Sequence, residues 1–359
     1  MLETPSYIFD ARVFRERILA VRQQLTDRIP LVYSIKANAF LLHCLPEEIR
    51  HVEVCSPGEL ALCEQLGIAP ERILYSGVMK EADDVARAIR CGADILTAES
   101  AEHYRLICEQ ARPQVRVLLR LTSGNQFGMD MAVLQEIIQS RAAHPEVEIV
   151  GLHYYSGTQK KLRGIEKDLA KLRAALETLR EDCGYTPQLV EYGPGLSADY
   201  FEGTEAGADR RAQDWEMERL AEASGLLRAF AEEYPLSVEM GRFLASPCGE
   251  YYSRVCDIKT NDGVRYAILD GGIHQLHYYG QTMAMQVPQI RVLRGDSGGE
   301  VLSGPASAER MPQPLAPRDS SDGEAQAACD TYCLCGSLCT VADVLVREVA
   351  LPRLKGGDV

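Results

Sequence analysis

The stretch Leu31-Val-Tyr-Ser-Ile-Lys-Ala-Asn-Ala39 places one lysine, Lys36, directly after a short apolar run that is typical of a buried strand. An unpaired ammonium group at such a place is costly, so it must be paired, neutralised or used in a covalent bond. Lys36 is therefore a candidate for a lysine that bonds to a carbonyl compound. The alternative is a lysine whose side chain reaches from the strand end to water, and this stretch alone does not decide between them.

Seven further apolar runs resemble this one, and stretches of helical length and pattern separate them. We expect strands at 31–37, 51–55, 72–76, 94–97, 115–121, 147–155, 188–192 and 236–240, and helices at 59–66, 82–89, 101–110, 134–142 and 164–180. Eight alternations of strand and helix predict a closed (β/α)8 barrel of the α/β class rather than an open doubly wound sheet, which usually has fewer strands. In such a barrel the residues that follow the strands form the active site.

The pattern changes after residue 245, where strand candidates at 249–258, 265–269 and 285–293 follow one another without helices. This change predicts an antiparallel β domain after the barrel. We therefore expect a barrel at 10–245 and a β domain at 246–359 that also includes residues 1–9. Residues 295–328 are rich in Gly, Ser, Pro, Ala and Asp, which predicts a flexible insertion.

The composition excludes several classes of partner. With 359 residues, of which 46% are hydrophobic and 25% charged, the chain has the composition of a soluble globular protein. No apolar run approaches the roughly 20 residues of a membrane span. A formal net charge of -14 disfavours nucleic acid and anionic membranes as partners, so a small-molecule ligand is expected. The first residues lack the pattern of a secretion signal, and we expect the cytoplasm as the location.

The twelve cysteines are spread along the chain, and without a secretion signal we expect reduced thiols. Cys329, Cys333, Cys335 and Cys339 form the one cluster, with the spacing C-x3-C-x-C-x3-C. This spacing does not match the C-x2-C pairs of common zinc sites. We expect no metal there, although the spacing does not decide the matter.

Groups that suit a phosphate follow the last three predicted barrel strands. Gly193 and Gly195 allow backbone amides to approach a ligand, Thr158 adds a hydroxyl group, and Arg242 adds a guanidinium fork. Each feature has a simpler interpretation, since a G-x-G is usually a turn and an arginine after a strand is usually a surface ion pair. Their occurrence on the last strands, where barrels commonly bind phosphate, predicts a phosphate site.

A phosphate group at one end of a ligand and a lysine amine at the other are what pyridoxal 5′-phosphate requires. Lys36 would hold its aldehyde carbon. Glu239, in Val-Glu-Met-Gly-Arg, would keep the ring nitrogen protonated so that the ring can accept electrons. The alternative for Glu239 is an ion pair with Arg242 at the strand end.

Seven groups of residues carry a resemblance over nearly the whole chain. In order they are Tyr33-Ser-Ile-Lys-Ala-Asn38, Cys55-Ser-Pro-Gly-Glu-Leu60, Phe127-Gly-Met129, Gly151-Leu-His-Tyr-Tyr-Ser-Gly-Thr-Gln159, Gly193-Pro-Gly195, Glu239-Met-Gly-Arg242, and Cys339 with Asp343. With these motifs the chain resembles the fold-type III pyridoxal-phosphate amino-acid decarboxylases, which include the diaminopimelate, ornithine and carboxynorspermidine enzymes. It is more distantly similar to alanine racemase.

The resemblance implies a homodimer with shared active sites that decarboxylates its substrate through an external aldimine and a quinonoid. Lys36 would form the internal aldimine, and Cys339 of a second subunit would protonate the α-carbon after carbon dioxide leaves. Tyr155 stands where the family usually has a histidine stacked on the cofactor ring. The residues that would hold the cofactor phosphate are Thr158, Gly193, Gly195, Gly241 and Arg242.

The chain departs from the family on the substrate side. Diaminopimelate decarboxylases have a glutamate after the catalytic cysteine and an arginine in the segment corresponding to 270–279, where this chain has Thr340 and Leu276-His-Tyr-Tyr279. Diaminopimelate would lack its usual partners, and the distal ammonium of lysine or ornithine would lack a carboxylate. We expect an amino acid, or an intermediate of amino-acid or polyamine metabolism, with a polar but not plainly basic distal group. Candidate substrate contacts are Thr340, Asp343 and His274.

Members of the family continue past the position of Gly357-Asp358 into a strand with a Gly-Ala-Tyr that contacts the phosphate, whereas this chain stops at Val359. Either the chain is truncated, or a tyrosine comes from elsewhere, or cofactor binding is weakened. Two alternatives to a decarboxylase stay open. A racemase is disfavoured because alanine racemases place an arginine, not a glutamate, against the ring nitrogen. A non-catalytic binding relative is disfavoured by Lys36 and Cys339 and favoured by the missing C-terminal strand.

Overall fold

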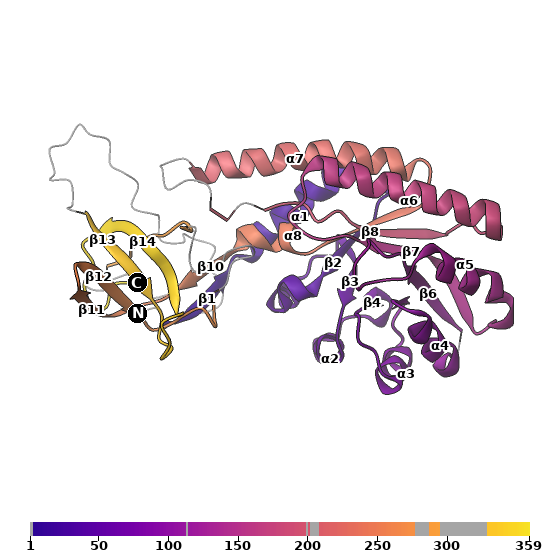
Figure 1. Cartoon of the computed structure of the whole chain (residues 1–359), viewed down its shortest axis with the longest axis horizontal. Helices are drawn as coiled ribbons and strands as arrows, with labels where there is room; N and C mark the ends of the chain where they lie inside the picture. The colour runs from indigo at the N-terminus through magenta and orange to yellow at the C-terminus, as the bar shows by residue number, and fades with distance from the viewer. Residues whose placement is uncertain (1–2, 113, 199, 202–207, 277–286, 295–328) are drawn as a thin grey trace. The chain divides into compact units, whose positions relative to one another are not determined.

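The computed structural model describes residues 3–112, 114–198, 200–201, 208–276, 287–294 and 329–359 (Figure 1). The predicted insertion at 295–328 lies outside these residues. The chain forms two compact units. The larger unit comprises Asp10–Ala198 and Glu216–Cys248, and the smaller unit comprises Met1–Phe9, Asp199–Trp215 and Gly249–Val359.

A closed parallel barrel forms the larger unit, with its eight strands in sequence order. The strands are β2 (Leu31–Ser34), β3 (Ile49–Val54), β4 (Ile73–Tyr75), β5 (Ile95–Ala98), β6 (Val115–Arg120), β7 (Val147–Tyr155), β8 (Leu189–Gly193) and β9 (Leu236–Met240). Strand β9 pairs with β2 through Leu31 and Val238, which closes the sheet. The predicted (β/α)8 barrel is confirmed.

The helices are α1 (Ala11–Leu25), α2 (Pro57–Gln65), α3 (Ala82–Cys91), α4 (Ala101–Gln110), α5 (Met131–Ser140), α6 (Leu162–Cys183), α7 (Ala208–Ala231) and α8 (Arg242–Ala245). Local signals set where several of them begin and end. Asp10, Ser56 and Asp130 accept hydrogen bonds from first-turn amides of α1, α2 and α5. Gly92 and Gly184 end α3 and α6 in the left-handed conformation.

The barrel interior is apolar except at one group of residues. Leu74, Ile95, Leu118 and Val150 pack together from four successive strands, and burial of each such side chain contributes about 1.5–3 kcal/mol. This pattern is typical of parallel strands that are covered on both faces. The buried polar residues of these strands are Ser34, His51, Glu53, Thr97, Arg120, His153, Glu191, Ser237 and Glu239.

The smaller unit contains a four-stranded sheet and a two-stranded sheet. The four strands are β11 (Val255–Asn261), β12 (Val264–Leu269), β13 (Cys329–Cys335) and β14 (Val344–Pro352), and β1 (Ser6–Phe9) pairs with β10 (Gly249–Tyr252). Tyr332, Leu334 and Val346 are among the residues of its apolar core. Strand β12 runs parallel to β13, so the sheet is mixed and the predicted antiparallel arrangement holds only for its other pairs.

The strand that we predicted at 285–293 is wrong in its described part, since residues 287–293 form no strand. Val287, Ile290 and Val292 nevertheless pack against the core of the smaller unit. The apolar pattern therefore indicated burial correctly, but it did not indicate a place in the sheet. Among the described residues, no helix is long and apolar enough to cross a membrane.

Candidate active site

Lys36 lies beyond the end of β2, in a 3-10 turn formed by Ile35–Ala37, and not at the strand end where the sequence had placed it. The residues around the turn fix its course, because the Tyr33 hydroxyl donates to the Asn38 carbonyl at 2.8 Å and the Asn38 side chain accepts from the amide of Phe40 at 3.0 Å. The Lys36 side chain is 44% exposed. A small molecule can therefore reach its amine.

Two buried carboxylates hold the amine of Lys36. Its Nζ lies 3.1 Å from Oε2 of Glu53 and 3.5 Å from Oε1 of Glu239, with the Cys55 sulfur at 3.9 Å. Burial alone would lower the pKa of Lys36, but the charges of Glu239 and Glu53 outweigh it and raise that pKa. The amine thus faces a charged site and is not simply extended into water.

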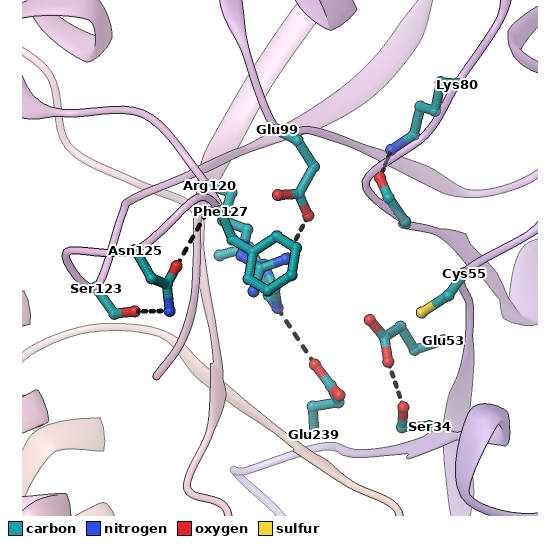
Figure 2. A network of polar contacts seen from close by, with 12 residues as sticks. Ser34, Glu53, Cys55, Lys80, Glu99, Arg120, Ser123, Asn125, Phe127 and Glu239 are labelled. Carbon is teal, nitrogen blue, oxygen red and sulfur yellow. Dashed lines mark hydrogen bonds and ion pairs between the residues drawn. The ribbon is translucent and has the colours of Figure 1, made fainter. Parts of the chain in front are cut away.

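Glu239 is one of the carboxylates in the network of polar contacts that Figure 2 shows. Its Oε2 lies 3.2 Å from Nε2 of His153, which is fully buried on β7. Burial, helped by the charge of Arg120, lowers the pKa of His153 to about 3, so the ring is neutral and donates this hydrogen bond. Burial alone would raise the pKa of Glu239, but Lys36 and neighbouring hydrogen bonds lower it overall, so Glu239 is ionised.

Glu191 on β8 is a second buried carboxyl group, and its pKa is shifted in the opposite direction to that of Glu239. It is 0% exposed, and neither of its oxygens has a hydrogen-bond partner among the described residues. Burial first, and then the charges of Glu239 and Glu53, raise its pKa well above the usual value. A pair of acids whose environments separate their pKa values in this way is typical of catalytic sites. Glu191 is neutral while Glu239 carries the charge.

Two further cations lie in the same network (Figure 2). Arg120, at the end of β6, forms an ion pair with Glu99 and lies 5.2 Å from the ring centre of Phe127. Lys80 is buried and donates to the carbonyl of Gly77. Burial is the main cause that lowers the pKa of Lys80 to about 8.

Glycine residues and the ring of Tyr155 lie close to the amine of Lys36. The Tyr155 ring lies 5.4 Å from Nζ of Lys36, and a side chain at Gly193 would meet that ring at 2.6 Å. A side chain at Gly195 would lie 2.0 Å from the carbonyl oxygen of Gly157, and one at Gly241 would lie 2.8 Å from Ser34. Only glycine permits these approaches. Tyr155 also interacts with Thr158 and Arg242, so the predicted phosphate-binding residues of the barrel gather here.

The other predicted site residues belong to the smaller unit. Asp343, which we predicted to contact substrate, instead binds its own backbone, since Oδ1 accepts from the amide of Ile273 at 2.8 Å and Oδ2 from that of Leu338 at 2.7 Å. It is buried, and both oxygens are used. Asp343 thereby ties the loop that carries His274 to the loop that carries Cys339 and Thr340, both of which are exposed. These contacts give Asp343 a positioning role in this unit, and its contact with substrate stays a prediction.

Sequence reasoning gave no role to several residues of this site, among them His153, which stands in one of the quoted motifs, Glu191 and Lys80. A signal existed for the first, because His153 and Tyr155 are two residues apart on β7 and so share the face toward the interior. Glu191 interrupts an otherwise apolar strand. Lys80 follows β4 in a loop and gave no signal that would distinguish it from a surface lysine.

Comparison with known proteins identifies a family whose model matches this chain. The model of the family described as "Pyridoxal-dependent decarboxylase, pyridoxal binding domain" matches residues 11–246, about two thirds of the chain. This range contains all eight barrel strands and the site around Lys36.

Two curated relatives match nearly the whole chain. An L-glutamyl-[BtrI acyl-carrier protein] decarboxylase of Niallia circulans is 25% identical over 99% of this chain and 82% of its own length. A 2-[(L-alanin-3-ylcarbamoyl)methyl]-2-hydroxybutanedioate decarboxylase of Staphylococcus aureus is 24% identical over 98% of this chain and 86% of its own. The fold is similar to that of diaminopimelate decarboxylase from Helicobacter pylori, with a TM-score of 0.74, 20% identity and coverage of 100% of this chain and 85% of that one.

Proposed function

The chain belongs to the family of pyridoxal-dependent decarboxylases, and we propose that its substrate is an amino acid, or an amino-acid-derived intermediate, with a polar distal group that is not plainly basic. The chain is a pyridoxal-phosphate-dependent carboxy-lyase that acts at an α-carboxyl group. The observation that carries the assignment of its active site is the accessible amine of Lys36 between the buried carboxylates of Glu53 and Glu239.

The residues around Lys36 fit the cofactor. The amine of Lys36 would bond its aldehyde carbon, ionised Glu239 would keep a proton on its ring nitrogen, and Tyr155 would lie against the ring. When bound, pyridoxal phosphate supplies a ring that accepts the electron pair left when carbon dioxide departs. The residues that would hold its phosphate are Thr158, Gly193, Gly195, Gly241 and Arg242.

Three residues of this site would hold or accept protons at named atoms. Glu53 Oε2, at 3.1 Å, can accept the proton that Lys36 must lose before its nitrogen can bond to carbon. The neutral ring of His153 donates to Glu239 and so stabilises the charge that Glu239 needs in order to hold a proton on the cofactor. Glu191 stays protonated, which limits the negative charge that the site must bury.

We place Cys339 of a second copy of the chain at the same site, as the acid that protonates the α-carbon. This implies a homodimer with shared active sites. The exposure of Cys339, on a loop that Asp343 fixes, supports the proposal. A location in the cytoplasm is supported by buried thiols such as Cys63, Cys108 and Cys248, which form no disulfide bond.

Thr340 and the relatives support the class of substrate. Thr340 carries no charge. A substrate ammonium group buried beside it would be unpaired and costly, whereas a distal amide or acyl group would not. Of three relatives that match nearly the whole chain, two are named for substrates in which an amino-acid unit is joined to a larger group, through an acyl or a carbamoyl link, and the third is a diaminopimelate decarboxylase. We therefore place an acyl or amide link, which is itself uncharged, next to Thr340.

A test of the function is carbon dioxide release by the purified full chain with added cofactor. The substrates are L-glutamate, its side-chain amides and thioesters, L-lysine, L-ornithine and diaminopimelate. We expect the highest kcat/KM for the neutral conjugates. Preference for lysine, ornithine or diaminopimelate would contradict the substrate class. Release from no amino acid, or racemisation without carbon dioxide release, would overturn the decarboxylase function itself. Active protein that sediments only as a monomer would overturn the shared site.

A further inference from the structure

A second cluster of reactive side chains lies in the larger unit, among residues that have no part in the site around Lys36. Cys108 belongs to α4, and His144 and Glu146 belong to the segment that leads into β7. One ligand atom of each, namely sulfur, ring nitrogen and carboxylate oxygen, lies within 4.8 Å of both others. Figure 1 shows α4 and α5 on the outside of the barrel, next to β6 and β7.

These three donors are the kinds that zinc prefers. Zinc binds Cys sulfur at about 2.3 Å and His nitrogen or carboxylate oxygen at about 2.0–2.2 Å, in tetrahedral sites. Two donors of one such ion lie roughly 3.3 Å apart by that geometry. The Nδ1 atom of His144 lies 3.2 Å from Oε1 of Glu146, which matches. A hydrogen bond between these two residues could explain that distance alone, but it does not explain the sulfur of Cys108 beside them.

The segment that supplies two of the donors is fixed by its backbone. The amide of His144 donates to the carbonyl of Arg141 at 3.1 Å, and the carbonyls of His144 and Glu146 accept from the amides of Val147 and Val115 at 3.0 Å. The His144 ring also lies edge to face with Tyr104, with ring centres 5.8 Å apart. The donors are therefore held together before any ion binds.

A cavity and a buried hydroxyl group adjoin the cluster. The cavity measures about 360 Å³, and Cys108, His144, Glu146 and Tyr104 are among its lining residues. The Tyr104 hydroxyl is buried, and the group with which it interacts is the Cys108 sulfur. Three protein donors leave a fourth position of a tetrahedral ion for water, and the cavity has room for it.

We propose that Cys108, His144 and Glu146 form a binding site for a divalent cation of the zinc class, separate from the cofactor site. The ion binds the thiolate of Cys108, Nδ1 of His144 and a carboxylate oxygen of Glu146, and the thiol proton is released on binding. Because the ion would link α4 to the segment before β7, it stabilises the folded larger unit.

The test uses the cofactor-loaded full chain dialysed against zinc, with metal content measured by mass spectrometry. Wild-type protein should hold one more zinc per chain than Cys108→Ser, and binding to the variant should weaken more than the roughly 10–100-fold that loss of a supporting partner costs. The matched control is Cys183→Ser, a thiol outside the cluster, which should leave zinc content unchanged. His144→Ala repeats the test at a more exposed side chain if Cys108→Ser does not fold.

A second readout assigns the ion to its ligands. Zinc should slow alkylation of the peptide that contains Cys108, and should not protect the peptide that contains Cys333 and Cys335, whose sulfurs lie 3.8 Å apart. Equal zinc content in wild type, Cys108→Ser and His144→Ala would overturn the proposal, as would protection of Cys333 and Cys335 alone. Neither readout depends on decarboxylation.

Discussion

Two buried carboxylates, one in each unit, show how similar groups serve different ends. Glu239 in the barrel and Asp343 in the smaller unit are 5% and 3% exposed. The oxygens of Glu239 face Nζ of Lys36 and Nε2 of His153, which are side chains that can gain or lose protons. The oxygens of Asp343 accept hydrogen bonds from two backbone amides, which do not gain or lose protons. The partners of a buried carboxylate, rather than its burial, distinguish chemistry from support.

The surroundings of Glu239 and Asp343 also differ. Side chains at Gly272 or Gly336 would lie within 2.6 Å of the Asp343 oxygens, so the loops close tightly around a fixed charge. Glu239 instead lies beside Lys36, whose side chain is open to a ligand. A substitution at Glu239 should therefore change the reaction itself, and one at Asp343 should change the geometry of a loop.

The largest effect should follow from Glu239→Gln. The amide cannot hold a proton on the cofactor ring, so we expect kcat for carbon dioxide release to fall by on the order of 10²–10⁴-fold while the cofactor remains bound. Steady-state kinetics and the visible absorbance of the bound cofactor measure the two effects. Glu148→Gln, on the same sheet but hydrogen-bonded to Gln188, is the matched control and should retain activity. Full activity of Glu239→Gln would remove the distinction between the two carboxylates.

Asp343→Asn should have a smaller effect. The amide group can still accept from one backbone amide, but its NH2 group opposes the other, which costs about 1–3 kcal/mol. We expect kcat to fall by roughly tenfold, with cofactor binding unchanged, and the alkylation rate of Cys339 to change because its loop shifts. Loss of cofactor absorbance, with no change at Cys339, would show that Asp343 acts on the cofactor and not on the loop.

The smallest effect concerns stability and pH. His153 has a folded-state pKa of about 3, so between that value and the ordinary value near 6.5 the unfolded chain binds a proton that the folded chain does not. Stability should therefore fall as the pH falls through this window, by up to about 2 kcal/mol between pH 6.5 and 5. Urea unfolding at the two values should show a smaller loss in His153→Gln than in the exposed control His43→Gln. An equal loss would contradict the neutral buried ring.

The sequence predicted the barrel well because its signals are local. Each strand is a short apolar run, and Lys36 is the single cation after the first of them. The residues that it missed depend on contacts far along the chain. From the sequence, His153 could be an ordinary core histidine. The fold places it against Glu239, which lies 86 residues further along the chain. Strand β13 likewise pairs with β12 across 295–328, which no local pattern reports.

Asp343 shows a different limit of the sequence. Its position after Cys339 resembles a family motif, and the motif alone does not say whether a carboxylate meets substrate or backbone. The two amide contacts reveal the backbone role, while contact with substrate stays a prediction. The class of residue was predictable here, while its partner was not.

The most direct test of the account is the identity of the lysine that bonds the cofactor. Lys36 is accessible but its pKa is raised, whereas the pKa of buried Lys80 is lowered to about 8, so nucleophilicity alone favours Lys80. Borohydride reduction of the loaded protein, followed by peptide mapping, fixes the cofactor to its lysine. We predict the label on the peptide that contains Lys36, and none in Lys36→Ala. A label on Lys80, or one that persists in Lys36→Ala, would contradict the account.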